Sequence, residues 1–264
     1  MTFVGLFSTT NVFSATLDTS NFSINSSVAT VMDWYVQLLS KNPQGELLNQ
    51  YPQNIQQIKV IKIKFIDTKQ VNKHQFNVEL LLTHKDLDKP VSKIINETIV
   101  LHLSSKIPKV EKIIKDKERV VATLNNQDRN QLYYQQRRFI YAWLAWMDGD
   151  QSRVPIAGKQ SNYVVNIAGN QIQGNVFSAL EKRSQYLHKG KHLLHSMEVK
   201  ALGDNTFAFN IIVEYKGVNA NNQKVIAKIR QNIRAKLNHN TWQIITIKEK
   251  HLLPDIAPWI GFVC

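Results

Sequence analysis

A helical hydrophobic pattern followed by long strand patterns occurs twice along this chain of 264 residues, and this order constrains the fold most strongly. Residues 28–40 and 131–147 place apolar side chains three and four positions apart, which predicts an amphipathic helix in each half. Each helix precedes strands in which apolar and polar side chains alternate, between residues 58 and 103 and between residues 195 and 249. Helices followed by runs of such strands predict an α+β fold with antiparallel sheets.

Two strand sequences indicate an internal repeat. FNVELLLTHK at 76–85 and FAFNIIVEYK at 207–216 share their apolar alternation and a final lysine, and a polar turn and a Lys-Ile strand follow each. Between helix and strands, the second half also holds a long segment that predicts a short strand at 163–168 and a second helix at 175–189. The first half has no room for either element, so we predict that its copy is degenerate.

We therefore predict a first α+β domain at 25–121 and a complete second one at 128–252, followed by a C-terminal tail at 253–264. Residues 1–24 are expected to be a leader or the remnant of an export signal, because they begin apolar and uncharged and carry VFSA at 12–15. A signal would have Lys or Arg before its apolar part, and this stretch has none. A periplasmic or secreted protein is favoured, and a cytoplasmic protein with an unstructured leader is the alternative. No apolar run reaches the roughly 18 residues of a membrane-spanning helix.

Basic residues outnumber acidic ones, with 33 Lys and Arg against 20 Asp and Glu and a formal net charge of +13. Such a surplus favours anionic surroundings. One face of a predicted strand gathers part of this charge at Lys228, Arg230, Arg234 and Lys236. A solvated face is the first interpretation, and a face that binds an acidic protein partner or an anionic surface is the second. Nucleic acid is not favoured, because aromatic side chains at base-stacking spacing are absent from the face.

The second half resembles the nuclear transport factor 2-like superfamily, in particular its SnoaL-like branch. The order that carries the resemblance is a long helix ending in a small-Gly-Asp turn, a short strand, a second helix and four long strands. Its residues are Tyr141, Ala145, the MDGD turn at 147–150, Gly174 and His195. The resemblance extends over residues 128–251 and, in outline, over 28–103.

This resemblance implies two tandem cystatin-like cones, in each of which a helix lies across the mouth of a curved antiparallel sheet. Members of the superfamily commonly pair through their sheets, so the resemblance also implies an internal pseudo-dimer; a higher oligomer stays open. The superfamily includes isomerases, cyclases and dehydratases that act on apolar rings, and many members without activity. One scaffold can carry unrelated sites, so the resemblance indicates a fold more than a function.

A catalytic cone would need an ionisable side chain facing its interior, typically as a general base. His195 shares strand parity with Met197 and Val199 and is the one inward candidate, with a satisfied core histidine as the alternative. No carboxylate falls on the inward positions assigned to the predicted strands, and Asp148 and Asp150 are expected in a turn.

Aromatic side chains of the second half are candidates for a small apolar ligand. They are Tyr141, Trp146, Tyr163, Tyr186 and Phe209. Aromatic residues line most ligand pockets, but at these spacings an ordinary hydrophobic core is the alternative.

Metal and cofactor chemistry is not expected. His188, His192 and His195 have no carboxylate or cysteine near them in the sequence, so we predict no metal site. The chain has no glycine-rich phosphate loop, no G-x-S-x-G and no H-E-x-x-H, so we predict no cofactor. Cys264 is the one cysteine and excludes an internal disulfide.

We predict a non-enzymatic, exported binding or scaffold protein built from two nuclear transport factor 2-like domains. The alternative is a SnoaL-like enzyme of the isomerase, cyclase or dehydratase type, with one pocket in the second domain and His195 as its base.

Overall fold

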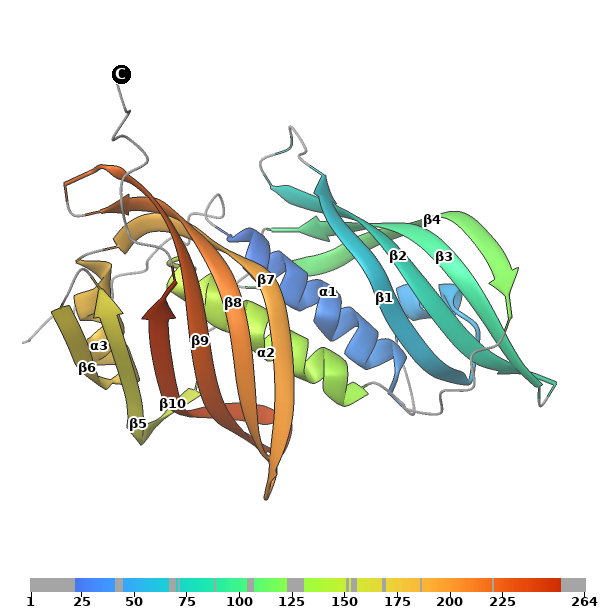
Figure 1. Ribbon diagram of the computed structural model, residues 1–264. Helices are drawn as coiled ribbons and strands as arrows, with labels where there is room; N and C mark the ends of the chain where they lie inside the picture. Colours follow the sequence, from blue (N-terminus) through green and yellow to red (C-terminus); the bar gives the residue numbers. More distant parts are fainter. Residues whose placement is uncertain are drawn as a thin grey trace, which may run out of the picture.

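Two curved sheets enclose a pair of helices in the computed structural model (Figure 1). The structure describes residues 22–40, 45–66, 70, 72–87, 89–103, 107–122, 131–150, 152, 156–167, 170–185, 187–219 and 221–252. The expected leader up to residue 21, the tail from residue 253 with Cys264, and Tyr186 lie outside these residues.

The first unit is a helix followed by a four-stranded antiparallel meander. Its elements are α1 (Ile24–Leu38), the short 3-10 helix η2 (Glu46–Gln50), β1 (Ile55–Ile66), β2 (Lys73–Asp86), β3 (Lys89–His102) and β4 (Lys109–Val121). The strands pair in the order β1-β2-β3-β4. The sequence of residues 110–114 is compatible with a strand or with a connector, and these residues lie within β4.

The second unit repeats this plan and adds to it. Its elements are α2 (Gln131–Met147), β5 (Ile156–Ile167), β6 (Asn170–Asn175), α3 (Val176–Ser184), β7 (Leu187–Gly203), β8 (Thr206–Asn219), β9 (Lys224–Asn238) and β10 (Thr241–His251). The strand order is β6-β5-β10-β9-β8-β7, and only β5 and β10 pair in parallel. The meander β7 to β10 corresponds to β1 to β4, while the described part of the first unit has no counterpart of β5, β6 or α3. The α+β fold with two such units is therefore confirmed.

Local sequence signals explain several element boundaries. An extra residue at Val60-Ile61 interrupts the alternation of the first strand in the sequence and predicts a bulge. The bulge is present, because the register of β1 with β2 shifts between Val60 and Lys62. The turn between β7 and β8 places Asp204 and Asn205 at φ 49° and 54°, the left-handed conformation that a tight hairpin needs.

Helix α3 begins at the predicted position and ends earlier than predicted. The side chain of Asn175 caps it by accepting from the N–H of Phe177 at 3.1 Å. The predicted end near residue 189 is wrong, since β7 already begins at Leu187. Gly190 lies in that strand, and a Cβ at this position would collide with the ring of Tyr215. The sequence predicts Gly190 as the end of the helix, and this prediction is wrong, because the glycine instead makes room for an aromatic ring.

Each sheet encloses a separate hydrophobic core. In the second unit, α2 contributes Phe139, Ile140, Trp143 and Leu144 to a core closed by the inner faces of β8, β9 and β10. In the first unit, α1 packs on the inner face of β1 to β4. Tyr134 and Tyr141 of α2 pack against this first core, so α2 carries two apolar faces and contributes to both units.

The two units meet along α1 and α2 (Figure 1). Arg138 of α2 lies 2.9 Å from Asp33 of α1, and the Tyr134 hydroxyl donates to the carbonyl of Ile58 at 2.9 Å and accepts from the N–H of Val60 at 3.1 Å. The expected pairing through the sheets is therefore wrong, because the helix layers form the junction. No helix among the described residues is long and apolar enough to cross a membrane.

Candidate functional site

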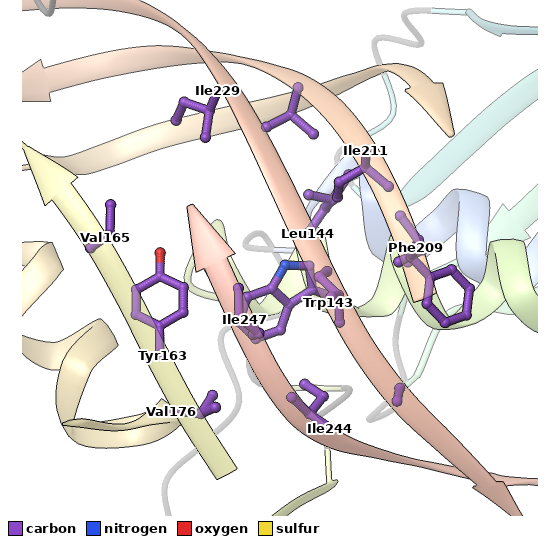
Figure 2. Packing of buried hydrophobic residues seen from close by; sticks show 14 of the residues in the cluster. Trp143, Leu144, Tyr163, Val165, Val176, Phe209, Ile211, Ile229, Ile244 and Ile247 are labelled. Carbon is purple, nitrogen blue, oxygen red and sulfur yellow. The ribbon is translucent and has the colours of Figure 1, made fainter. Parts of the chain in front are cut away.

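A cluster of buried polar side chains lies inside the second unit, among the aliphatic and aromatic residues of its core. The polar members are Asp148, Tyr163, Arg183, His192, Gln231, Glu249 and His251. They come from the end of α2, from α3 and from four different strands. Figure 2 shows Trp143 and Tyr163 among isoleucine, leucine and valine side chains of the core.

Glu249 is the centre of the cluster. Its Oε1 accepts from Arg183 Nε at 3.0 Å and from His251 Nε2 at 2.9 Å, and its Oε2 accepts from the Tyr163 hydroxyl and from Gln231 Nε2, both at 2.6 Å. Burial alone would raise the pKa of Glu249, but the Arg183 guanidinium and the donors from His251 and Tyr163 outweigh it and hold the pKa well below its usual range. The carboxylate is therefore ionised, and four donors occupy its lone pairs.

His192 forms the second part of the cluster with Asp148. Its Nδ1 lies 2.7 Å from Asp148 Oδ1, and its Nε2 lies 3.4 Å from the guanidinium of Arg183. Burial and the nearby Arg183 lower the pKa of His192, although Asp148 opposes this effect. The imidazole is thus neutral, with the proton on Nδ1 facing the carboxylate and the lone pair on Nε2 facing Arg183.

Trp143 and Gln231 complete the network. The indole N–H of Trp143 donates to Gln231 Oε1 at 2.9 Å, and this orients the amide so that its nitrogen donates to Glu249. Arg183, buried on α3, thereby gains a carboxylate partner that is itself held in place from three other directions. A buried charge of this kind requires such pairing.

His195, the predicted base, does not face the interior. Its side chain is 45% exposed and lies 3.5 Å from Glu214 on the outer face of the sheet. The register of β7 shifts between Leu194 and Ser196, so Leu194 and Met197 both point inward, while His195 and Ser196 between them are exposed. The inward prediction is wrong because the bulge breaks the alternation, and His192 takes the interior position.

The statement that no carboxylate faces the interior is also wrong. Glu249 belongs to the alternation of Ile247 and Glu249 on β10, opposite the outward Lys248 and Lys250. Extending the strand parity to this last strand would have identified it. The network partner Arg183 has no such signal, because its position on a short helix becomes buried only when α3 packs on the sheet.

The five aromatic candidates divide between different places. Tyr163 and Phe209 are fully buried in the second core. Trp146 is half-buried at the border of that core, with ring centroids 5.7 Å from Trp143 and 5.3 Å from Phe177. Tyr141 packs against the first core, and its assignment to the second is wrong because α2 has two apolar faces. Tyr186 lies outside the described residues.

The Asp-Gly-Asp turn after α2 joins the two units. Asp150 Oδ2 accepts from the N–H of Ser23 at 2.9 Å, and Asp148 Oδ2 accepts from Asn25 Nδ2 at 2.8 Å, so both carboxylates lie at the N-terminus of α1. Negative charge at this end of a helix is stabilising. Gly149 allows the turn, since its φ of 89° disfavours residues with a side chain. Asp148 therefore connects the helix junction with His192 in the second interior.

The first unit has a smaller counterpart of the buried cluster around Glu97. The hydroxyls of Tyr35 and Tyr51 donate to its two oxygens at 2.9 and 2.5 Å. Burial raises the pKa of Glu97, which these two donors and the nearby Lys115 only partly offset. In both units an aromatic side chain of the long helix donates to a polar residue on the third strand of the meander, from Tyr35 to Glu97 and from Trp143 to Gln231.

The predicted basic residues share the outer face of β9. Lys228, Arg230 and Arg234 are exposed and Lys236 is half-buried, while Ile229, Gln231 and Ile233 between them point inward. Among the described residues, no group of three or more His, Cys, Asp or Glu is placed to hold a metal ion. The side chain of His188 is not among those described.

No family model matches the sequence, and no curated protein matches it. Solved structures do resemble it, with 41 matching chains. Hexachlorocyclohexane dehydrochlorinase LinA-type3 from Novosphingobium barchaimii LL02 is 12% identical with a TM-score of 0.43, and the match covers 52% of this chain and 97% of that one. An uncharacterized protein with a cystatin-like fold from Caulobacter vibrioides is 16% identical with a TM-score of 0.37, covering 46% and 89%. An NTF-2 like protein of unknown function from Silicibacter pomeroyi DSS-3 is 11% identical with a TM-score of 0.34, covering 47% and 98%.

Proposed function

We propose that this protein is a non-enzymatic binding or scaffold module made of two nuclear transport factor 2-like units that pack on each other through their helices. The observation that carries the proposal is the saturation of the buried network. Four donors occupy the oxygens of Glu249, and both ring nitrogens of His192 face protein partners. A general base must present a free lone pair to its substrate, and neither group does.

The filling of both sheets supports the same proposal. The inner face of each sheet is covered by the chain's own helices and side chains, including Trp143 and Tyr35, which are both fully buried. The outer faces and edges then remain for a partner. Export belongs to the proposal as well and rests on the apolar, uncharged start of the sequence.

One observation favours the enzyme as a second candidate. His192 and Asp148 form a buried histidine–carboxylate pair, an arrangement that orients an imidazole for proton transfer. Such an enzyme would use His192 rather than His195, and Arg183 would have to move away from Nε2 before a substrate could reach it.

Binding of apolar ring compounds to the purified protein tests the two candidates. We expect that indole or benzene does not raise the melting temperature of the unaltered protein. The variant Phe209→Ala serves as a positive control, because Phe209 is buried among apolar side chains and an engineered apolar cavity of this kind binds small aromatic molecules. Saturable stabilisation of the unaltered protein, lost in His192→Ala, would instead support the enzyme.

A further inference from the structure

The outer face of β8, β9 and β10 carries an uncompensated positive charge. The cations of this surface, which we call the basic face, are Lys228, Arg230, Arg234, Lys236, Lys248 and Lys250. None of the six forms an ion pair within the described part of the chain. The described outer positions of these three strands hold one carboxylate, that of Glu214, which Lys216 and His195 already contact at 2.5 and 3.5 Å.

Strand pairing brings these like charges close together. Arg230 is the register partner of Lys250, and the outward side chains of Lys228 and Arg230 follow each other at the two-residue repeat of the same strand. Opposed side chains of an antiparallel pair have Cβ atoms about 5 Å apart, where like charges destabilise the sheet. Glu214 is the register partner of Lys228 and is the one carboxylate on the described outer positions of these strands. It cannot balance all six cations, and an external anion would relieve the remaining repulsion.

Apolar side chains border the basic face at one end. Ile226 and Leu193 are 43% and 56% exposed, and the register places them beside Lys216 and Glu214. Protein interfaces combine arginine with apolar contacts of this kind. Bound bases would instead need aromatic platforms, and the aromatic residues of β8 and β10 face the core: Phe207, Phe209, Tyr215 and Trp242.

We propose that the basic face docks an acidic surface of a partner protein, an inference that rests on the proposed binding function. A second copy of this chain does not fit, because it carries the same cations and the same net charge of +13, and the two copies would repel each other. A flat anionic membrane fits poorly, because the strands curve around α2 and present a convex outer face (Figure 1). A partner protein can follow this curvature and supply both carboxylates and small apolar groups.

Fluorescence anisotropy with labelled probes tests the docking face on the full chain. The probes are a short peptide that alternates Glu with Leu, one that alternates Glu with Ser, an oligothymidylate of equal length, and vesicles containing phosphatidylserine. We expect both peptides to bind, the Glu-Leu peptide more tightly, and the affinity to fall with salt, because exposed charges are screened over about 8 Å at physiological ionic strength.

Charge reversal locates the binding. Arg230→Glu with Arg234→Glu should weaken peptide binding about tenfold. Each exposed charge contact is weak, but two attractive contacts are lost and two repulsive contacts replace them. The matched control reverses Lys59 and Lys62, exposed residues of β1, with the same change in net charge, and should leave binding within about twofold. In Ile226→Ser, the advantage of the Glu-Leu peptide should disappear.

Three results would overturn the proposal: no peptide binding, an equal loss in the β1 control, or tighter binding of the oligonucleotide or the vesicles through the same arginines. The scaffold proposal is tested separately, because it fails if ring compounds bind in the interior, whatever the outer face binds.

Discussion

Glu249 and Glu97 are both buried on the inner face of a sheet, yet their surroundings move their pKa values in opposite directions. Glu249 faces a guanidinium and three further donors, which lower the pKa of its carboxyl. Glu97 has two tyrosine donors and a more distant lysine, and burial raises the pKa of its carboxyl. The ionised form is therefore favoured by folding at Glu249 and disfavoured at Glu97.

This difference predicts opposite responses to substitution by glutamine. Glu249→Gln leaves Arg183 as an unpaired buried cation and should lower the free energy of unfolding at pH 7 by about 3–5 kcal/mol. Glu97→Gln removes a carboxylate whose ionised form is disfavoured. This substitution should change the free energy of unfolding by less than about 1 kcal/mol in either direction. Urea denaturation at pH 7 measures both values. A larger loss of stability for Glu97→Gln than for Glu249→Gln would contradict this account of the two networks.

The pH dependence follows from the same shifts. The folded pKa of Glu249 lies below the unfolded value of about 4.3. Its contribution to stability is therefore present above a pH of about 4.3 and is lost as the pH falls from there through the folded pKa. The unaltered protein should therefore lose stability in acid more steeply than Glu249→Gln. Because the folded pKa of Glu97 is raised, its contribution is present at low pH and is lost as the pH rises through the folded value. Parallel acid titrations of the unaltered protein and Glu249→Gln would contradict the assignment.

The two neighbouring tryptophans of α2 should differ in their contribution to stability. Trp143 is fully buried and hydrogen-bonded to Gln231, so Trp143→Ala should cost about 3–5 kcal/mol. Trp146 is half-buried at the border of the core, so Trp146→Ala should cost clearly less. Chemical denaturation of the two variants measures the difference. An equal or larger loss for Trp146→Ala would place the interior on the other side of the helix.

At the scale of elements, the turn after α2 is the N-terminal anchor of α1. Asp150→Ala removes the acceptor of the Ser23 N–H and a carboxylate from the start of a helix, and should cost about 1–2 kcal/mol. Glu181→Ala is the control, since this carboxylate is exposed on α3, and should change stability by less than about 0.5 kcal/mol. Thermal unfolding of both variants compares them, and equal melting temperatures would remove the anchoring role.

At the scale of the whole molecule, α2 belongs to both cores, so the units should unfold together. Circular dichroism and tryptophan fluorescence should report one coincident transition in urea. Tyr134→Phe, which removes the hydroxyl between α2 and β1, should shift this single midpoint by the loss of about 1 kcal/mol. Two separate transitions would show that the units are thermodynamically independent despite their helix junction.

The sequence by itself determined the fold class, the two copies of the helix-and-meander plan and the bulge near Ile61. These features depend on local hydrophobic periodicity and turn chemistry, which a single segment carries without its neighbours. The outward alignment of Arg230 and Arg234 was predictable for the same reason, since an uninterrupted strand keeps its two-residue alternation.

Only the tertiary structure decided the interior of the candidate site. A bulge in β7 places His195 on the outer face and His192 in the interior, because one extra residue reverses the parity of a strand. No local signal in the sequence indicated this bulge. Packing of α3 on the sheet buried Arg183 beside Glu249, a pairing between residues far apart in sequence. The partner of the second apolar face of α2 is the first core with α1, and the sequence did not show this. A helix pattern shows which faces are apolar and not what covers them.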